Sequence, residues 1–225
     1  MADKPTFYVT RNYLKAALRI APKNDIRYFL NSVFIEADAT HTTMVATDGA
    51  ALLALHQKAE NKLEKPVSVI MPREVCESIL KLNIKPLPAI GIAQESDDEF
   101  STLLTSLAEN STLHFRGIEA TYPDWKRVIP EKVSGEAGTF NPEYLQTFKK
   151  VADDIDGSFS HIQNGPNEGS VVCLDAEMEC FAIVMPMVGN LNPEAWKVPD
   201  WAQKPKEKSA PKKKAVRVKK EAVAA

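Results

Sequence analysis

A short β-rich run followed by an amphipathic helix occurs three times along this chain, and no other feature limits its possible folds as strongly. The three copies begin at Phe7, at Val67 and with the predicted strand 139–140, so the unit restarts at roughly 65-residue intervals, as in an internal repeat. Pro72 and Pro142 suit the first turn of a helix. Each helical stretch carries apolar side chains at helical spacing. The sequence therefore predicts three related strand-helix units.

Three further β-rich runs follow each helix, so every unit has the order β-α-β-β-β. One such unit leaves an edge of its small sheet unpaired, and two units must join to close a compact domain. Three units make one and a half domains, and the predicted class is α+β with helices on one face of antiparallel sheets. The predicted strands cover 32–37, 42–46 and 51–56 in the first unit, 89–93, 101–104 and 111–115 in the second, and 158–162, 170–174 and 180–184 in the third.

The repeat units and the composition together divide the chain into four segments: a two-unit domain over 1–131, the third unit over 132–189, a tethering segment over 190–203 and a tail over 204–225. The tail has nine basic and two acidic residues and almost no large apolar side chain, which predicts disorder. Its charge of +7 leaves −9 for the rest of a chain whose net charge is −2. Because an acidic body is repelled by nucleic acid, any DNA contact must come from a basic face or from the tail. The tail has two interpretations, a nonspecific DNA arm or an aid to solubility.

Basic side chains recur at helical spacing on the three predicted helices. Regularly spaced cations on helices suit the phosphates of a DNA duplex without reading its bases. The alternative is that they belong to ordinary solvated helix faces. The candidate phosphate contacts are Arg11, Lys15 and Arg19 in the first helix, Arg73 and Lys81 in the second, and Lys149 and Lys150 in the third.

Signatures of catalysis, metals and membranes are weak. Asp153, Asp154 and Asp156 lack the spacing and the closing Glu of a calcium loop, so we interpret them as a helix-ending turn. The three cysteines and four histidines show no zinc or disulfide pattern, and no nucleotide-binding or hydrolase motif occurs. No apolar run of about 18 residues and no signal peptide are found. We predict a cytoplasmic protein that is not an enzyme and has no metal and no cofactor.

Four runs, taken in order, resemble the bacterial sliding clamp family, the beta subunit of DNA polymerase III. They are D-I-R-Y-F-L-N at 25–31, V-A-T-D-G at 45–49, Y-P-D-W-K-R-V-I-P at 122–130 and I-V-M-P-M at 183–187. The resemblance covers about residues 7–187. It implies a DNA clamp-like fold, a ring of domains that each pair two β-α-β-β-β halves, with helices lining a positively charged hole. It also implies a protein without a catalytic site, which slides on duplex DNA and tethers polymerases and repair proteins through their short peptides.

The resemblance places two sets of site residues on this chain. Its DNA-contacting stretch falls on Asn24, Arg27, Tyr28 and Phe29. Apolar side chains form the expected recess for a partner peptide, and Arg127 is expected to anchor an acidic or carbonyl group. The simpler alternative is that Leu30, Leu52 and Val128 belong to the core. The cleft falls on Leu30, Thr47, Gly49, Leu52, Pro123, Arg127, Val128, Ile183, Met185, Pro186 and Met187.

The chain departs from the family at the cleft and beyond it. Ala50 and Ala51 stand where the family usually has His-Arg, which puts partner preference in doubt. Val188 stands where the family ends on a basic residue, and the chain then continues. Large apolar residues of this extension, such as Trp196 and Trp201, are candidates to occupy the cleft in cis.

The chain also matches only part of the family's architecture, a complete middle domain and the second half of the last domain. A closed ring of twelve halves then needs four chains, whereas paired half-domains give a dimer that does not encircle DNA. Our first hypothesis is a non-catalytic processivity or tethering factor, a homo-oligomer that holds replication or repair proteins on double-stranded DNA, with a possible clamp loader. The alternative is a non-encircling adaptor or decoy that binds clamp-binding proteins through the cleft.

Overall fold

Three repeat units are present in the computed structural model, which describes residues 4–82, 89–105, 110–187 and 199, and the third unit lacks the predicted strand before its helix. The tail and nearly all of the predicted tethering segment lie outside the described residues, and the boundaries at 131 and 203 stay predictions. The first unit contains β1 (Thr6–Thr10), α1 (Arg11–Ala17), β2 (Ser32–Ala37), β3 (His41–Thr47) and β4 (Ala51–Lys58). The second contains β5 (Val67–Pro72), α2 (Arg73–Lys81), β6 (Ala89–Gln94), β7 (Glu99–Thr105), β8 (Asn110–Ser111) and β9 (His114–Arg116). The third contains α3 (Pro142–Asp154), β10 (Ser160–Ile162), β11 (Ser170–Cys173) and β12 (Cys180–Val184).

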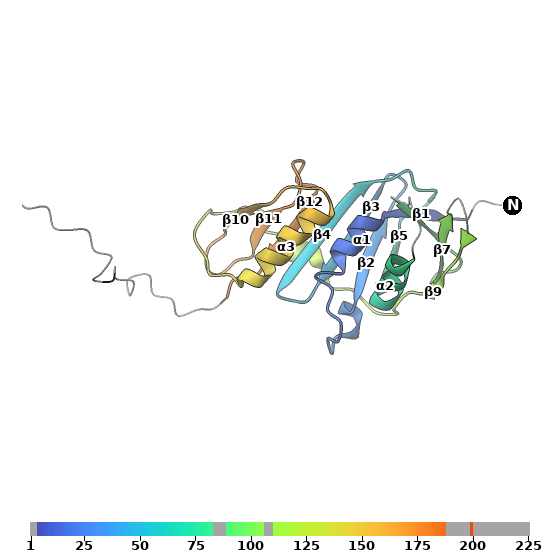
Figure 1. The fold of residues 1–225 in the computed structure, drawn as a ribbon, viewed down its shortest axis with the longest axis horizontal. Helices are drawn as coiled ribbons and strands as arrows, with labels where there is room; N and C mark the ends of the chain where they lie inside the picture. The colour runs from blue at the N-terminus through green and yellow to red at the C-terminus, as the bar shows by residue number, and fades with distance from the viewer. Residues whose placement is uncertain (1–3, 83–88, 106–109, 188–198, 200–225) are drawn as a thin grey trace, which may run out of the picture. The chain divides into compact units, whose positions relative to one another are not determined.

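The strands form two antiparallel sheets. The larger sheet has the order β10-β11-β12-β4-β3-β2-β5, and the smaller has β1-β6-β7-β8 with β9 also paired to β7. In Figure 1, α3, α1 and α2 lie side by side on one face of the larger sheet, and α1 contacts both of the other helices. The predicted α+β class, with helices on one face of antiparallel sheets, is confirmed.

The first two units exchange strands. In each of them the strand before the helix pairs with the first strand after the helix of the other unit, so that β1 pairs with β6 and β5 pairs with β2. Inward-facing apolar side chains from all four strands close this seam, and each is at most 4% exposed. These residues are Phe7, Val9, Val33, Ile35, Val69, Met71, Ile90 and Ile92.

Two arginines fasten α1 and α2 to each other. Arg11, the first residue of α1, donates to the carbonyl of Leu80 at the end of α2. Arg73, the first residue of α2, donates to the carbonyls of Leu18 (2.9 Å) and Ala21 just after α1. The last carbonyls of a helix lack intrahelical donors and carry partial negative charge, so a guanidinium satisfies them well. The pair therefore holds the helices antiparallel.

The third unit joins the first through β12, which pairs with β4, and through α3, which lies beside α1. Asn141 caps α3, because its side chain accepts a hydrogen bond from the backbone N–H of Glu143 (3.0 Å), and Pro142 opens the helix. The predicted strand at 139–140 is wrong. In the first two units this strand pairs with a strand of the opposite unit, and among the described residues no second unit stands beside the third to supply one.

A strap of residues 117–130 crosses the sheet face that lies opposite the helices. Its Tyr122 stacks on Phe34 of β2, with ring centroids 4.7 Å apart. Because side chains alternate between the two faces of a strand, Leu52 and Ile183 point to the strap while their neighbours point to the helices. A second, smaller core forms there, and it supports the candidate site. Its buried members are Leu30, Val45, Leu52, Ala54, Ile70, Tyr122 and Ile183.

Candidate functional site

An apolar recess of about 220 Å³ opens where the first unit, the strap and the third unit meet. Four segments form it: the stretch before β2, the β3–β4 turn, the strap and the end of β12. Its floor is buried, whereas Val128 and Met185 at its rim are 44% and 41% exposed. The lining residues are Arg27, Leu30, Thr47, Gly49, Ala50, Ala51, Leu52, Pro123, Asp124, Trp125, Val128, Ile183 and Met185.

The β3–β4 turn is held by its own side chains. The carboxylate of Asp48 accepts hydrogen bonds from the backbone N–H groups of Ala50 (2.9 Å) and Ala51 (2.8 Å). The hydroxyl of Thr47 donates to the carbonyl of Ala51 (2.7 Å) and accepts from the N–H of Gly49. Gly49 has a φ of +93°, a conformation that favours glycine. Asp48 and Gly49 thus form a tight turn between the two strands.

The guanidinium of Arg27 covers this turn. Its Nε and Nη2 donate to the two carboxylate oxygens of Asp25 (2.9 and 2.7 Å), and Nη2 also donates to the carbonyl of Asp48 (2.8 Å). A side chain on Gly49 would place its Cβ only 2.7 Å from Nη1, so the guanidinium would have to shift. The hydrogen bonds from Arg27 lower the pKa of Asp25 to about 2. A fixed positive charge therefore stands at the rim of the recess.

Eight of the eleven predicted cleft residues line the recess, namely Leu30, Thr47, Gly49, Leu52, Pro123, Val128, Ile183 and Met185. Leu30 and Leu52 are also core residues, since both are buried in the smaller cluster, but Val128 is exposed. Arg127, Pro186 and Met187 are outside the lining set.

The sequence prediction missed several lining residues, Arg27 among them. Arg27, which the resemblance places in the DNA-contacting stretch, lines the recess, whereas Arg127 does not. Trp125 and Asp124 belong to the same Y-P-D-W-K-R run as Pro123, so that run was the available signal. Ala50 and Ala51 line the recess as well, at the positions where the family usually has His-Arg.

The predicted phosphate contacts on the helices are mostly bound within the chain. Arg11 and Arg73 hold helix ends, as described above. Lys15 and Arg19 both bind Asp154 of α3, at 2.8 and 2.5 Å. Burial alone would raise the pKa of Asp154, but the hydrogen bonds from Arg19 and Lys15 outweigh it and lower that pKa.

Other members of the predicted DNA set face solvent. Lys149 pairs with Asp153. Lys81 and Lys150 are exposed, and no ion pair to another described residue is found for either. Tyr28 is 58% exposed, Asn24 is exposed, and the ring of Phe29 packs edge-on against Tyr28. The cations that remain free for an external phosphate are fewer than the sequence stripes suggested.

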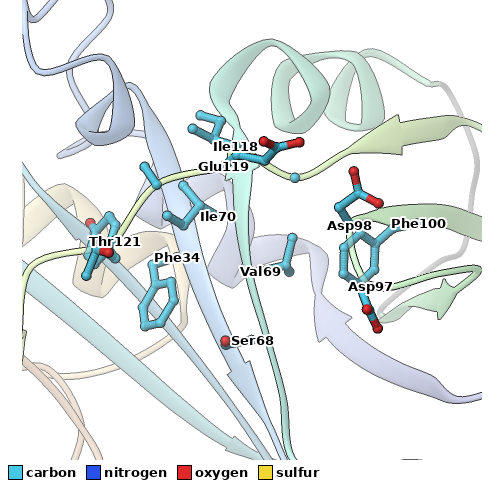
Figure 2. A pocket seen from close by; sticks show the side chains of 13 residues that line it. Phe34, Ser68, Val69, Ile70, Asp97, Asp98, Phe100, Ile118, Glu119 and Thr121 are labelled. Atoms are coloured by element: carbon cyan, nitrogen blue, oxygen red, sulfur yellow. The ribbon is translucent and has the colours of Figure 1, made fainter.

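A larger, more polar groove of about 490 Å³ lies between β2, β5 and the start of β7, beside the strap. Figure 2 shows the carboxylates of Asp97 and Asp98 beside the ring of Phe100, with Phe34 on the opposite side. Asp98 is paired with Arg116 of β9 (3.0 Å). Within the described ranges, no group of His, Cys, Asp or Glu could hold a metal ion, and none of the helices there is long and apolar enough to cross a membrane.

No family model matches the chain. The chain is 28% identical to the beta sliding clamp of Vibrio cholerae over 129 residues, which are 57% of this chain and 33% of that protein. It is 22% identical to the beta sliding clamp of Treponema pallidum over 142 residues, which are 63% of this chain and 37% of that protein. The chain thus spans about a third of the length of the curated relatives it matches.

Solved structures share the fold. A DNA polymerase sliding clamp of Pseudomonas aeruginosa with a ligand has a TM-score of 0.66 at 18% identity, over 83% of this chain and 68% of that one. The Helicobacter pylori beta clamp bound to a DNA ligase peptide has a TM-score of 0.64 at 12% identity, over 84% of this chain and 67% of that one. At these identities the likeness concerns the fold alone.

Proposed function

We propose, from the premise that this chain is a partial-length homologue of the beta sliding clamp family, that it is a non-catalytic tethering protein whose recess binds short peptides of other proteins. The observation that carries the proposal is the recess itself. It is apolar, it is open at its rim, and one chain supplies all of its walls. The partners that we propose are DNA polymerases or repair proteins with clamp-binding peptides.

The chemistry of the recess suits an extended peptide with apolar side chains. Leu52 and Ile183 form a buried apolar floor, while Val128 and Met185 at the rim are free to close over a ligand. Apolar pockets with a few fixed polar groups are typical of peptide-binding grooves. The Arg27 guanidinium already holds Asp25, and its Nη1 has no hydrogen bond within the described chain. We expect Nη1 to bind a carbonyl or carboxylate of the peptide.

The test is a titration with a fluorescein-labelled copy of the DNA ligase peptide that the Helicobacter pylori beta clamp binds. Fluorescence anisotropy should report saturable binding. Met185→Ala should weaken it about tenfold, since the variant removes apolar contact at the rim. Met178→Ala is the matched control, because Met178 is 66% exposed in the β11–β12 turn and lies outside the recess. Equal loss in both variants, or no binding by the wild type, would contradict the proposal.

A second candidate function, holding duplex DNA without sequence preference, rests on the helices that share one face of the sheet (Figure 1). Of the predicted helix cations, Lys81 and Lys150 have no ion pair to another described residue, and Asn24, Tyr28 and Phe29 lie near the start of β2. With about two phosphates neutralised, the logarithm of the binding constant should fall with the logarithm of salt concentration at a slope of about −1.8. Lys81→Ala combined with Lys150→Ala should flatten that slope. A slope that does not change would exclude this face.

A further inference from the structure

A hydroxyl group on α3 contacts the turn that forms one wall of the recess. Tyr144 lies in the first turns of α3, and its hydroxyl donates to Oδ2 of Asp48 at 2.6 Å. The two residues are 96 positions apart in the sequence. Tyr144 itself is outside the residues that line the recess. The third unit therefore contacts the β3–β4 turn through a residue that does not line the recess.

Asp48 is the residue that organises this turn. Its Oδ1 accepts the N–H groups of Ala50 and Ala51, its carbonyl accepts Nη2 of Arg27, and its Oδ2 accepts Tyr144. Three of these bonds come from residues that line the recess. The fourth, from Tyr144, comes from a different unit of the repeat. The orientation of the carboxylate is thus fixed from both sides.

We propose that Tyr144 is a positioning residue for the recess, holding Asp48 so that the turn and the Arg27 guanidinium keep the geometry that a peptide requires. This inference rests on the proposed peptide-binding function.

The bond has the properties that such a role needs. A hydroxyl that donates to a carboxylate at this distance makes a short, charge-assisted bond, stronger than one between neutral groups. Burial, and then the bond to Asp48, raise the pKa of Tyr144 to about 12, so the donor proton is retained throughout the physiological range. Without it, Oδ2 of Asp48 loses this partner, and the carboxylate is held only through Oδ1, by the N–H groups of Ala50 and Ala51. A recess that must be ordered during binding has a lower affinity than one that is already ordered.

The ring of Tyr144 has a separate role, because it packs against the larger core. Tyr144→Phe keeps the ring and removes only the hydroxyl, so it separates positioning from packing. Tyr13→Phe is a matched control. The hydroxyl of Tyr13, on α1, contacts the Sγ of Cys180 (3.4 Å) at the far end of β12 from Met185, so this variant also removes one half-buried hydroxyl.

Two measurements on the full chain test the role. Amide NMR spectra of the free protein should show shifts at Gly49, Ala50 and Ala51 in Tyr144→Phe but not in Tyr13→Phe. In anisotropy titrations with the labelled DNA ligase peptide, Tyr144→Phe should bind roughly 3- to 10-fold more weakly, and Tyr13→Phe should match the wild type. The melting temperatures of both variants are recorded as a check on folding.

The outcomes separate the two proposals. If the wild type binds the peptide and Tyr144→Phe binds it equally well, Tyr144 is not a positioning residue. If the turn amides do not shift in Tyr144→Phe, the inference fails whatever the peptide does. If the turn amides shift but the wild type does not bind, the hydrogen bond holds the turn and the proposed peptide-binding function is what fails.

Discussion

The two-unit domain and the third unit are built from one repeat, yet they differ where one unit would pair with another. The first two units pair there, whereas the third has no such partner among the described residues. Val9 and Met71 stand two residues before the first helical residue in their units, and both are fully buried. Phe140 stands at the same place in the third unit and is only partly buried. The inward-facing residue of β10, where β2 and β6 carry Val and Ile, is His161. The side of the third unit that no other described unit covers, near Phe140 and His161, is thus more polar than the seam of the first two units.

The helices also differ in how their first residues are bound. Arg11 and Arg73 bind the end of the neighbouring helix, whereas Pro142 stands at their position in α3. The third helix instead has a side-chain cap from Asn141 and runs for 13 residues, against 7 and 9 for α1 and α2. A helix with its own cap depends less on a partner.

A loop before α3 also binds the turn that follows β10. Gly135 donates to the carbonyl of Gln163 (3.0 Å), and Gly165 donates to the carbonyl of Glu136 (2.8 Å). Terminal units of repeat proteins close their free side with polar residues and loops. The difference teaches that the free side of the third unit carries polar groups and loop hydrogen bonds where the seam of the first two units is apolar.

The largest expected effect is at the seam of the two-unit domain. Phe7→Ala should lower the free energy of unfolding by about 3–5 kcal/mol, since Phe7 is fully buried there and also contacts Phe100. Phe140→Ala in the third unit should cost about half as much, because its ring is only partly buried. Urea unfolding of both variants measures the two free energies. Equal losses of stability would contradict the difference between the seam and the third unit.

The arginine pair should come next. Arg73→Met keeps much of the side-chain volume but leaves the carbonyls of Leu18 and Ala21 without their donor, which should cost about 2 kcal/mol. In the third unit, Asn141→Ala removes the local cap and should cost about 1 kcal/mol. Thermal or urea unfolding can rank the two, and a larger loss from Asn141→Ala would reverse our view of which contacts hold the helices.

A pH titration tests the ionic contact that joins the two regions. The pKa of Asp154 is lowered in the folded protein, so its contribution to stability is present above the ordinary carboxyl pKa of 3.8 and is lost as the pH falls through its folded pKa. Stability measured from pH 6 down to pH 2 should therefore decrease less steeply in Asp154→Asn than in the wild type. Parallel curves would show that Arg19 and Lys15 do not favour the charged carboxylate.

The smallest expected effect is at the open edge of the third unit. Ile162 of β10 is 36% exposed on the edge that a second copy would cover in a dimer of half-domains. Ile162→Asp should leave the native mass unchanged at every concentration, as measured by light scattering. A variant with a lower mass than the wild type would show that this edge is an interface after all.

The parts of the fold that depend on local sequence could be predicted. Apolar spacing and N-terminal prolines predicted the helices. The strand at 139–140 could not be predicted correctly, since a strand forms only where another strand pairs with it.

The site was predictable to a similar extent. Its apolar residues lie in runs that can be recognised, but the direction of Arg27 is set by hydrogen bonds to Asp25 and Asp48 that no spacing reveals. The ion pairs of the helix cations could not be predicted for a similar reason. The partner of Arg19 is Asp154, 135 residues away, and only the folded chain brings the two together.

The most direct test of the peptide-binding recess is methyl NMR of the full chain during titration with the DNA ligase peptide. We predict saturable shifts of the methyl groups of Leu52, Val128, Ile183 and Met185, all of which line the recess, with no change at Val69 and Ile118 in the polar groove of Figure 2. Shifts confined to the polar groove, or no saturable shift at all, would contradict the account.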